Sequence, residues 1–494
     1  VELIDTKLKG GLNDFNISVD TINTILGSLS VDKLGFKWDS IAEAYLFTNN
    51  SVNHSIQFKS FRLGKLLNQR SLDLVSGNIG LNAFIPLSGN FSLSNINGDL
   101  SQFDFNNYSY SNINISKGTF INNELKCKID INDDNLILSY NGSFDFKGIG
   151  HYQCEATLNK ATQDILQSEF AFLDSSDIFN TTIKMDLYGN DVNNLEGNIS
   201  LVNSKFAEFE IPEFDFDVVR SKEKDVFDLS CSLFDFHLEG KIDLHNIVDE
   251  FSNKLISIVP RTKNTIKTNL SLNNKNDFKY NLSVRNANSF LLHFKEYFPD
   301  LIIASGSRIY GNYNSIESDF KLNAESDLIR FNRILFSNIN INQSIKKGEI
   351  DASCNINSVT IRDSIQLNNV LFHSEGINNH LISNITWDPN SKYQSDVSWV
   401  TDIVSNEFVS LTILPSSFSI DKKKWIIADS SNILMANGTY KVSGFEMNRA
   451  EQLIRINGSI SRDYKDGLSL GLSNIDLSEI DHMFGINSGM KGSL

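Results

Sequence analysis

The sequence predicts an all-β protein: one elongated, curved, mostly antiparallel sheet that forms a hydrophobic groove (a β-taco), with a few short helices. Three observations predict it. Apolar and polar residues alternate along most of the chain, glycine recurs at apolar positions inside the alternating segments, and helical periodicity is confined to three short stretches. Alternation at period 2 is typical of a strand with one face away from water and one face in it.

The clearest alternation spans residues 234–245, where every even position is apolar or Gly and every odd position is polar. Residues 136–146 repeat the pattern with one lapse at Ile137, and the polar residues 132–135 precede them. We therefore expect a strand over 234–245 and a hairpin that turns at 132–135.

The large side chains on the apolar phase are expected to line one common face. They are Leu125, Ile129, Leu138, Tyr140, Phe144, Phe146, Ile199, Leu201, Phe227, Leu229, Phe234, Phe236, Leu238, Ile242, Leu244, Ile456 and Ile460. Each gains about 1.5–3 kcal/mol on leaving water, so something has to cover this face. A second sheet, closure into a barrel, or a trough filled by an apolar ligand would do so. The absence of boundaries between compact units in the sequence favours the trough.

Glycine occupies apolar slots in a recurring apolar-x-Gly-x-apolar pattern. The predicted strand-bending glycines are Gly77, Gly98, Gly142, Gly197, Gly240, Gly438 and Gly458. Glycine inside a strand marks a bend, a bulge or a close approach of another backbone. We expect these residues to let long strands curl around their apolar face.

Helical periodicity is found in residues 247–256 after Asn246, in residues 290–298 after Ser289, and in residues 478–484. Asn246 and Ser289 are suitable N-caps, and Pro260 and Pro299 stop the first two segments. These short helices are expected at the ends of the sheet. The alternation resumes after each one, so the chain reads as one continuous β segment over 1–494, with possible subregions 1–150, 151–300 and 301–494.

The charge balance bears on partners. The 494 residues include 60 acidic and 44 basic side chains, a net charge of −16. Nucleic-acid binding needs a surplus of clustered Lys and Arg, so no nucleic-acid partner is expected.

No run of about 18 apolar residues is present to span a membrane as a helix. The chain begins at Val1 without an initiator Met or a signal peptide, and we expect a processed protein or a fragment.

Candidate chemistry is sparse. The four cysteines, Cys127, Cys154, Cys231 and Cys354, lie on the apolar phase, and without a CxxC pair neither zinc nor redox chemistry is expected, although disulfides between neighbouring strands stay open. The eight His form no HExxH motif, and no GxSxG motif occurs. Residues 130–135 lack the Gly and Glu of a calcium loop. We expect no enzyme, no metal and no cofactor.

Several segments carry a family resemblance. They are Ile96–Leu100, Tyr108–Ile113, Lys117–Phe120, Cys127–Leu136, Tyr140–Phe144, Leu195–Ile199, Leu238–Leu244, Tyr297–Leu301, Leu414–Asp421 with Trp425, and Ile456–Ser461. In this order they resemble the middle region of TamB-like proteins of Bacteroidota-type bacteria, members of the AsmA/TamB superfamily of bridge-like lipid-transfer proteins. The resemblance covers the whole chain, but its motifs are strand patterns without a chemical signature.

The resemblance implies a periplasmic protein whose groove holds phospholipid. It also implies an inner-membrane anchor and a C-terminal domain that reaches a TamA-like outer-membrane barrel, neither of which lies in this chain.

Three functions are considered as hypotheses: a lipid conduit, a scaffold that assists outer-membrane barrel assembly, and an adhesin or glycan-binding protein. The last would need exposed aromatic clusters on the polar phase. Trp387 and Trp399 are present, but no aromatic stripe is.

Overall fold

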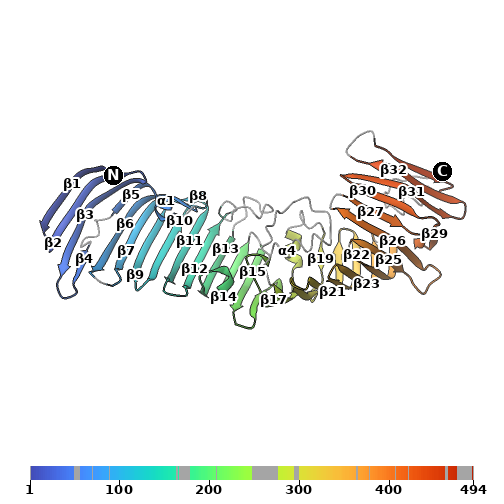
Figure 1. Cartoon of the computed structure of the whole chain (residues 1–494), viewed down its shortest axis with the longest axis horizontal. Coiled ribbons are helices and arrows are strands. Elements are labelled where there is room, and N and C mark those ends of the chain that lie inside the picture. Colours follow the sequence, from blue (N-terminus) through green and yellow to red (C-terminus); the bar gives the residue numbers. More distant parts are fainter. Residues whose placement is uncertain are drawn as a thin grey trace. The chain divides into compact units, whose positions relative to one another are not determined.

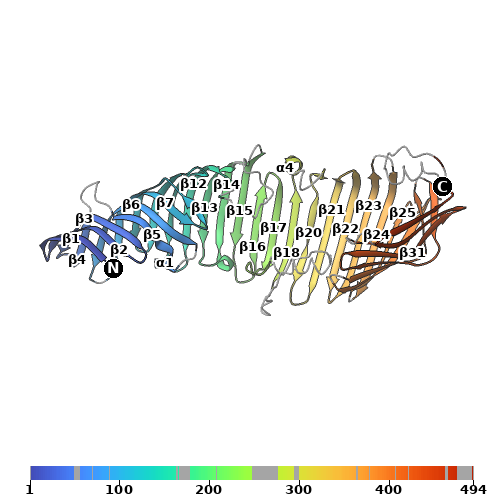
Figure 2. The ribbon, with the colours of Figure 1, turned by 90° about the horizontal axis from the view of Figure 1, so that it is seen from above.

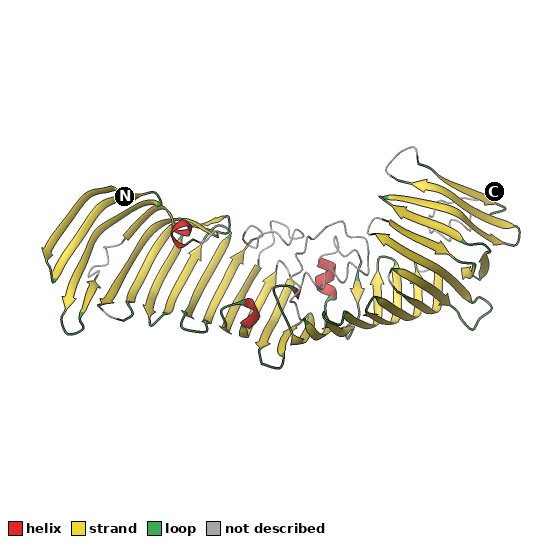
Figure 3. Cartoon of the chain, in the orientation of Figure 1, coloured by secondary structure: helices red, strands yellow, loops and turns green. Residues whose placement is uncertain are grey.

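A computed structural model describes residues 2–48, 56–68, 71–87, 89–162, 165, 179–206, 209–247, 276–293, 300–362, 365–377, 379–405, 408–420, 422–461, 466–475 and 492. Over these residues the chain is almost entirely β-strand, and every strand pairing is antiparallel (Figure 3). The prediction of an all-β, antiparallel fold with few helices is confirmed. It follows from the alternation, because period-2 side chains can share one apolar face only in a pleated sheet.

The chain divides into two compact units, whose strands and helices are labelled in Figure 1. The first comprises residues 1–220 and 228–232, and the second comprises residues 221–227 and 233–494. The division falls near residues 220–233, whereas the possible limits predicted from the sequence lie after residues 150 and 300. Each unit is described separately below.

Unit 1 is a ladder of strands in which chain neighbours pair. The strands are β1 (Glu2–Gly11), β2 (Asp14–Thr24), β3 (Gly27–Asp39), β4 (Ala44–Thr48), β5 (Ile56–Arg62), β6 (Leu72–Pro86), β7 (Ser92–Phe105), β8 (Tyr108–Tyr110), β9 (Ile113–Ile121), β10 (Glu124–Asn132), β11 (Leu136–Asp145), β12 (His151–Ala161), β13 (Phe179–Tyr188), β14 (Glu196–Phe206) and β15 (Phe209–Val219). Strands β4 and β5 share one place between β3 and β6, and β9 pairs with β7 and β10. The short helix α1 (Leu63–Leu67) and the 3-10 turn η1 (Val192–Asn194) lie between strands.

Unit 2 continues the same construction after β16 (Asp225–Cys231), whose residues are divided between the units. Its elements are β17 (Phe234–Lys241), β18 (Asp277–Val284), α4 (Asn288–His293), β19 (Ile302–Ile303), β20 (Arg308–Asn314), β21 (Asp319–Phe331), β22 (Ile334–Lys346), β23 (Glu349–Ile361), β24 (Ile365–Ile377), β25 (His380–Trp387), β26 (Ser395–Ser405), β27 (Phe408–Ile413), β28 (Ser416–Ile420), β29 (Lys423–Ile427), β30 (Ser431–Ala436), β31 (Thr439–Arg449), β32 (Gln452–Ile460) and β33 (Leu468–Ser473). Figure 2 shows the long strands β20 to β24 side by side. Between β26 and β31 the ladder divides: β27 pairs with β30, and beside them the hairpin β28–β29 pairs with β26 through β28 and with β31 through β29.

The predictions for individual hairpins, strands and helices have different outcomes. The hairpin at 132–135 is confirmed, since β10 and β11 pair on either side of it. The strand predicted over 234–245 is too long: β17 ends at Lys241, and a turn follows in which the Asp243 carboxylate accepts hydrogen bonds from the His245 amide and the Asn246 side chain. A helix is present near Ser289 as α4, but it begins at Asn288, so Ser289 lies inside it and is not the predicted N-cap. Residues 294–298 of that predicted helix lie outside the described residues, as do the helices predicted over 247–256 and 478–484 apart from Ile247.

Strand irregularities occur where non-glycine residues adopt a left-handed backbone. Asn95, Lys117 and Asn203 have φ values of 51°, 54° and 53°, and the strand register shifts beside each of them. These are β-bulges, which bend a strand and increase its twist. Asparagine and lysine, and not only the predicted glycines, therefore change the direction of the strands.

Candidate functional site

The apolar face of unit 1 is continuous across strands. Residues directly opposite each other in an antiparallel pair place their side chains on the same face. One such row runs over β9 to β13 and contains Phe120, Leu125, Phe144, Tyr152 and Leu187. A parallel row reaches β15 and contains Ile115, Ile129, Tyr140, Ala156, Ile183, Leu201 and Phe214.

The predicted lining residues of unit 1 fall on this face. Leu125, Ile129, Tyr140, Phe144 and Leu201 belong to the two rows above. The remaining members lie in adjacent rows, Leu138 opposite Ile131 and Leu158, and Ile199 opposite Met185 and Phe216. Phe146 lies just beyond the end of β11 and is 56% exposed. All but Phe146 are half-buried, so the structure covers this face only in part.

Unit 2 has a comparable face whose chemistry changes along the ladder. Phe236 is followed by Leu282, Ile309, Ala324, Ile341, Cys354 and Phe372, all of them apolar. The row that begins at Leu238 passes through Tyr280 and Leu322, and then becomes polar and small at Gln343, Ala352, Ser374 and Ser383. The hydroxyls of Ser374 and Ser383 are buried and bonded to each other at 2.8 Å. The alternation pattern does not predict this hydroxyl pair, because a serine at an apolar position looks like an interruption of the alternation.

The other predicted lining residues have mixed positions. Phe234 lies at the start of β17 opposite Val284, and Phe227 and Leu229 lie on β16, with Phe227 only 4% exposed. Ile242 is buried and Leu244 half-buried, but both follow the end of β17, so they do not belong to a strand as predicted. The chain turns there because the Asp243 amide donates to the Asn276 side chain instead of continuing the ladder.

A sealed cluster lies near the end of unit 2. Its centre is formed by Trp425, Ile427, Met447, Ile454 and Ile475, and Trp425 is only 1% exposed. Ile456, predicted to line an open groove, packs against this cluster, and Ile460 is 53% exposed at the end of β32. The hairpin β28–β29 supplies Trp425. This part of the apolar face is therefore closed by the protein's own side chains.

The predicted glycines separate into three kinds. Gly77, Gly197, Gly240 and Gly458 have φ between +121° and +149°, and at Gly240 a Cβ would lie 2.1 Å from the Asp277 carbonyl oxygen. Gly98 and Gly142 have ordinary φ values but are close-packed: a Cβ at Gly142 would lie 2.3 Å from the Tyr140 hydroxyl. Gly438 was expected inside a strand, which is wrong. With Asn437 it forms the two-residue turn between β30 and β31, where positive φ is required.

The cysteines support an apolar role. None of the four is in a disulfide. Cys127 and Cys154 face Gly142 from opposite sides, so they are two strands apart, about 9.6 Å, beyond the reach of a disulfide. Burial raises the pKa of both thiols, which keeps them neutral at pH 7.

A buried carboxylate, that of Asp133, lies in the turn between β10 and β11. Asp133 is 6% exposed and accepts hydrogen bonds from the Tyr108 hydroxyl at 2.6 Å, from the Ser111 amide and hydroxyl, and from the Asn135 amide. Burial alone would raise its pKa, but these hydrogen bonds outweigh it, and the pKa of Asp133 is lowered. The carboxylate therefore holds the β8 and β10–β11 turns together as an anion.

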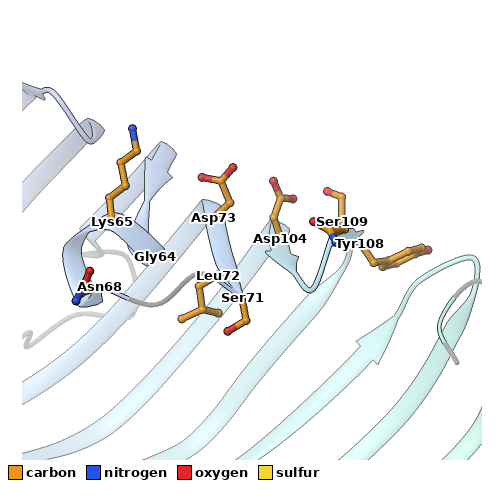
Figure 4. Close-up of a pocket in the computed structure, with 10 residues that line it drawn as sticks. Gly64, Lys65, Asn68, Ser71, Leu72, Asp73, Asp104, Tyr108 and Ser109 are labelled. Carbon is orange, nitrogen blue, oxygen red and sulfur yellow. The ribbon is translucent and has the colours of Figure 1, made fainter. Parts of the chain in front are cut away.

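Beside this carboxylate is an open polar hollow of about 490 Å³ (Figure 4). Its lining includes Lys65, Asp73, Asp104 and Tyr108, and Figure 4 shows the ends of the first three pointing to the same side. A second hollow of about 600 Å³ includes Lys126, Glu155, Lys184 and Asp186. Most of the residues that line the two hollows are polar or charged.

Catalytic or metal-binding geometry is not found in the described part of the chain. No group of three or more His, Cys, Asp or Glu there could hold a metal ion. His151 lies 2.7 Å from Asp186, and His380 lies 2.6 Å from Asp402, each as a partly exposed pair across neighbouring strands. Such pairs contribute little to stability and suggest no reaction.

Comparison with known proteins gives no relative: no family model, no curated protein and no solved structure matches this chain. Among the described residues, no helix has the length and apolar character needed to cross a membrane.

The apolar faces of the two units share one property. Many of the large apolar side chains on them are half-buried. Such a surface can hold an extended apolar molecule without any directional polar contact.

Proposed function

We propose that this chain is a segment of a hydrophobic conduit that transfers phospholipid between the inner and outer membranes of a Gram-negative cell envelope. One observation supports it most: rows of large apolar side chains cross many strands of unit 1, and most of these side chains are only half-buried, with Leu187 as a buried exception. Acyl chains match such a surface, because each buried CH₂ contributes about 0.8 kcal/mol without directional contacts.

The setting of this conduit is part of the proposal and rests on the TamB-like resemblance. The protein would act in the periplasm, anchored to the inner membrane by a segment outside this chain. It would meet a TamA-like barrel in the outer membrane. Its ligand would be phospholipid, and it would use no catalytic residue and no cofactor.

The first prediction tests lipid binding directly. Native mass spectrometry of gently extracted protein should find phospholipid bound to the wild type, and Phe144→Asp should reduce the bound fraction about tenfold, since a charge then faces the acyl chains. Phe144 is preferred to Leu238, which is only 7% exposed, so that an Asp there would destabilise the fold itself.

The matched control is Ser143→Asp, the neighbouring residue, which points to the other face of β11. It should leave lipid occupancy unchanged. Wild-type protein without any bound phospholipid, or equal occupancy in the two variants, would contradict the conduit.

A second candidate function is a scaffold for outer-membrane barrel assembly. The observation that favours it is that β1 pairs only with β2, and β33 only with β32, among the described strand pairings. A strand with an unpaired edge can accept another strand by β-augmentation.

Proline substitutions separate the two functions. Lys7→Pro and Leu8→Pro replace neighbouring residues of β1, one of which points its N–H away from β2. If the scaffold is correct, one of them should lower the amounts of outer-membrane barrels while lipid occupancy stays at the wild-type value. Normal barrel levels with both variants would exclude β1 as the assembly edge.

A further inference from the structure

Exposed apolar side chains are gathered at one edge of unit 1. Among the residues of unit 1 that the structure describes, eleven of the fifteen exposed large apolar residues lie at the strand ends and turns of one edge, which we term the apolar rim. They are Leu12, Ile41, Ile85, Leu87, Phe91, Ile121, Phe146, Ile149, Tyr188, Val192 and Val219. Scattered exposed apolar residues are ordinary, but a row of them along successive turns marks a contact surface.

The apolar face opens toward this rim. On β6, the exposed fraction of the side chain rises from 6% at Val75 to 45% at Ile85 and 71% at Leu87 just beyond the strand. From β11 it rises from 7% at Leu136 to 56% at Phe146. At the buried ends, Val75 and Leu136 belong to packed apolar clusters. On these two strands the face is thus closed at one end and accessible at the other.

Aromatic contacts join the rim to the face. The rings of Phe91 and Phe120 lie 5.4 Å apart, and Phe120 belongs to the row that crosses β9 to β13. Phe144 of the same row stacks on Phe146 at 6.5 Å. An apolar chain that touches the rim residue therefore also reaches the ring behind it, without crossing a polar group.

The opposite edge has different chemistry. Over β7 to β11 it consists of the Asp133 network and the polar hollow shown in Figure 4, with Phe105, 37% exposed, as the apolar exception in the turns between these strands. Over these strands, the exposed large apolar residues of the described chain therefore lie mainly at the rim and not at the opposite edge.

The charges near the apolar rim argue against docking on an anionic bilayer. Within unit 1, its turns and the strand residues that flank them carry seven acidic residues against Lys147 and Arg220. The acidic residues are Asp14, Asp39, Glu43, Glu124, Asp145, Asp191 and Glu196. An anionic membrane surface attracts basic clusters and repels an acidic edge.

We infer that hydrocarbon chains enter the apolar face of unit 1 sideways, over the apolar rim, and that Phe91 and Phe146 are the first residues they contact. This inference rests on the proposed lipid conduit and assigns its loading route. The ligand class is an amphipathic lipid whose tail crosses the rim while its polar group stays in water.

The test compares two matched phenylalanines in the full chain. Phe146 stacks on Phe144 at the apolar rim, and Phe105 stacks on Phe103 at the polar edge, both at 6.5 Å. A lysophosphatidylcholine with a fluorescent NBD group on its acyl chain, presented as monomers, reports uptake by stopped-flow fluorescence. Phe146→Ser should slow uptake about fivefold, the order expected from losing part of a phenylalanine's transfer free energy. Phe105→Ser should not slow it.

The outcomes are distinguishable. Equal rates for the two variants, with normal wild-type uptake, would overturn the side entry and leave the conduit intact. No uptake by the wild type would remove the conduit itself. The same labelled lipid embedded in phosphatidylcholine vesicles provides the second measurement: slower uptake from vesicles alone would make the rim a membrane-docking surface and would overturn its role in entry. Thermal unfolding of both variants at the wild-type temperature would establish that the fold is retained.

Discussion

At the scale of single residues, Asp133 illustrates how a buried charge can stabilise a turn. Its carboxylate is nearly inaccessible, yet it accepts hydrogen bonds from Tyr108, Ser111 and Asn135. A buried carboxylate is costly only when it is left without such donors. From the sequence, Asp133 reads as an ordinary turn residue, because three of its four hydrogen bonds come from Tyr108 and Ser111, more than twenty residues earlier.

Asp133→Asn should lower the free energy of unfolding by about 2 kcal/mol at pH 7, because one acceptor oxygen becomes an NH₂ donor that faces other donors. The folded-state pKa of Asp133 lies below the unfolded value of about 3.9. Its stabilisation is therefore present above pH 4 and is lost as the pH falls through the folded pKa. Urea unfolding at pH 7 and pH 3 should show this loss in the wild type and not in the variant.

The control is Asp134→Asn, since Asp134 is exposed in the same turn. It should cost less than about 0.5 kcal/mol. Equal effects of the two substitutions would show that the hydrogen bonds to Asp133 contribute nothing specific.

At the scale of elements, the strands follow the alternation, and their irregularities depend on backbone conformation. Asn95, Lys117 and Asn203 interrupt strands that the apolar pattern reads as regular. Asparagine tolerates the left-handed region better than most residues, so the asparagine-rich strands were a usable signal. For Lys117 no such signal exists.

The glycines offer a matched test of backbone strain. Gly240→Ala should lower the free energy of unfolding by at least about 2 kcal/mol, because its φ is +148° and the new Cβ would lie 2.1 Å from the Asp277 oxygen. Gly438→Ala should cost about 1 kcal/mol, because its φ of +78° is left-handed but no atom lies within 4 Å of the added Cβ. Chemical denaturation measures both, and a larger loss at Gly438 would contradict this assignment.

At the scale of the whole molecule, half-covered and sealed apolar surfaces coexist within one chain. Trp425 is enclosed by its cluster, with Arg449 5.1 Å from the ring centroid. Phe144 lies on the half-covered face of unit 1. The first arrangement stabilises the fold, whereas the second leaves apolar surface for a ligand.

Alanine substitutions should separate these roles. Trp425→Ala should reduce the free energy of unfolding by about 3–5 kcal/mol, the range for a large aromatic residue in a closed core. Phe144→Ala should reduce it by less than about 2 kcal/mol, since its side chain is already in partial contact with water. Calorimetry of the two variants is the measurement, and a larger loss for Phe144 would mean that its face is a closed core.

The sequence by itself determined the antiparallel β architecture, the 132–135 hairpin and the phase of residues such as Leu125, Tyr140 and Phe144, because side-chain alternation is a local property of a strand. Only the tertiary structure decided where β17 ends, that Gly438 is a turn residue, that Ile456 packs on a sealed cluster, and that the exposed apolar residues of unit 1 gather at one edge. Those features depend on which strands lie opposite one another, and hydrogen bonds and packing between residues far apart in the chain set that register.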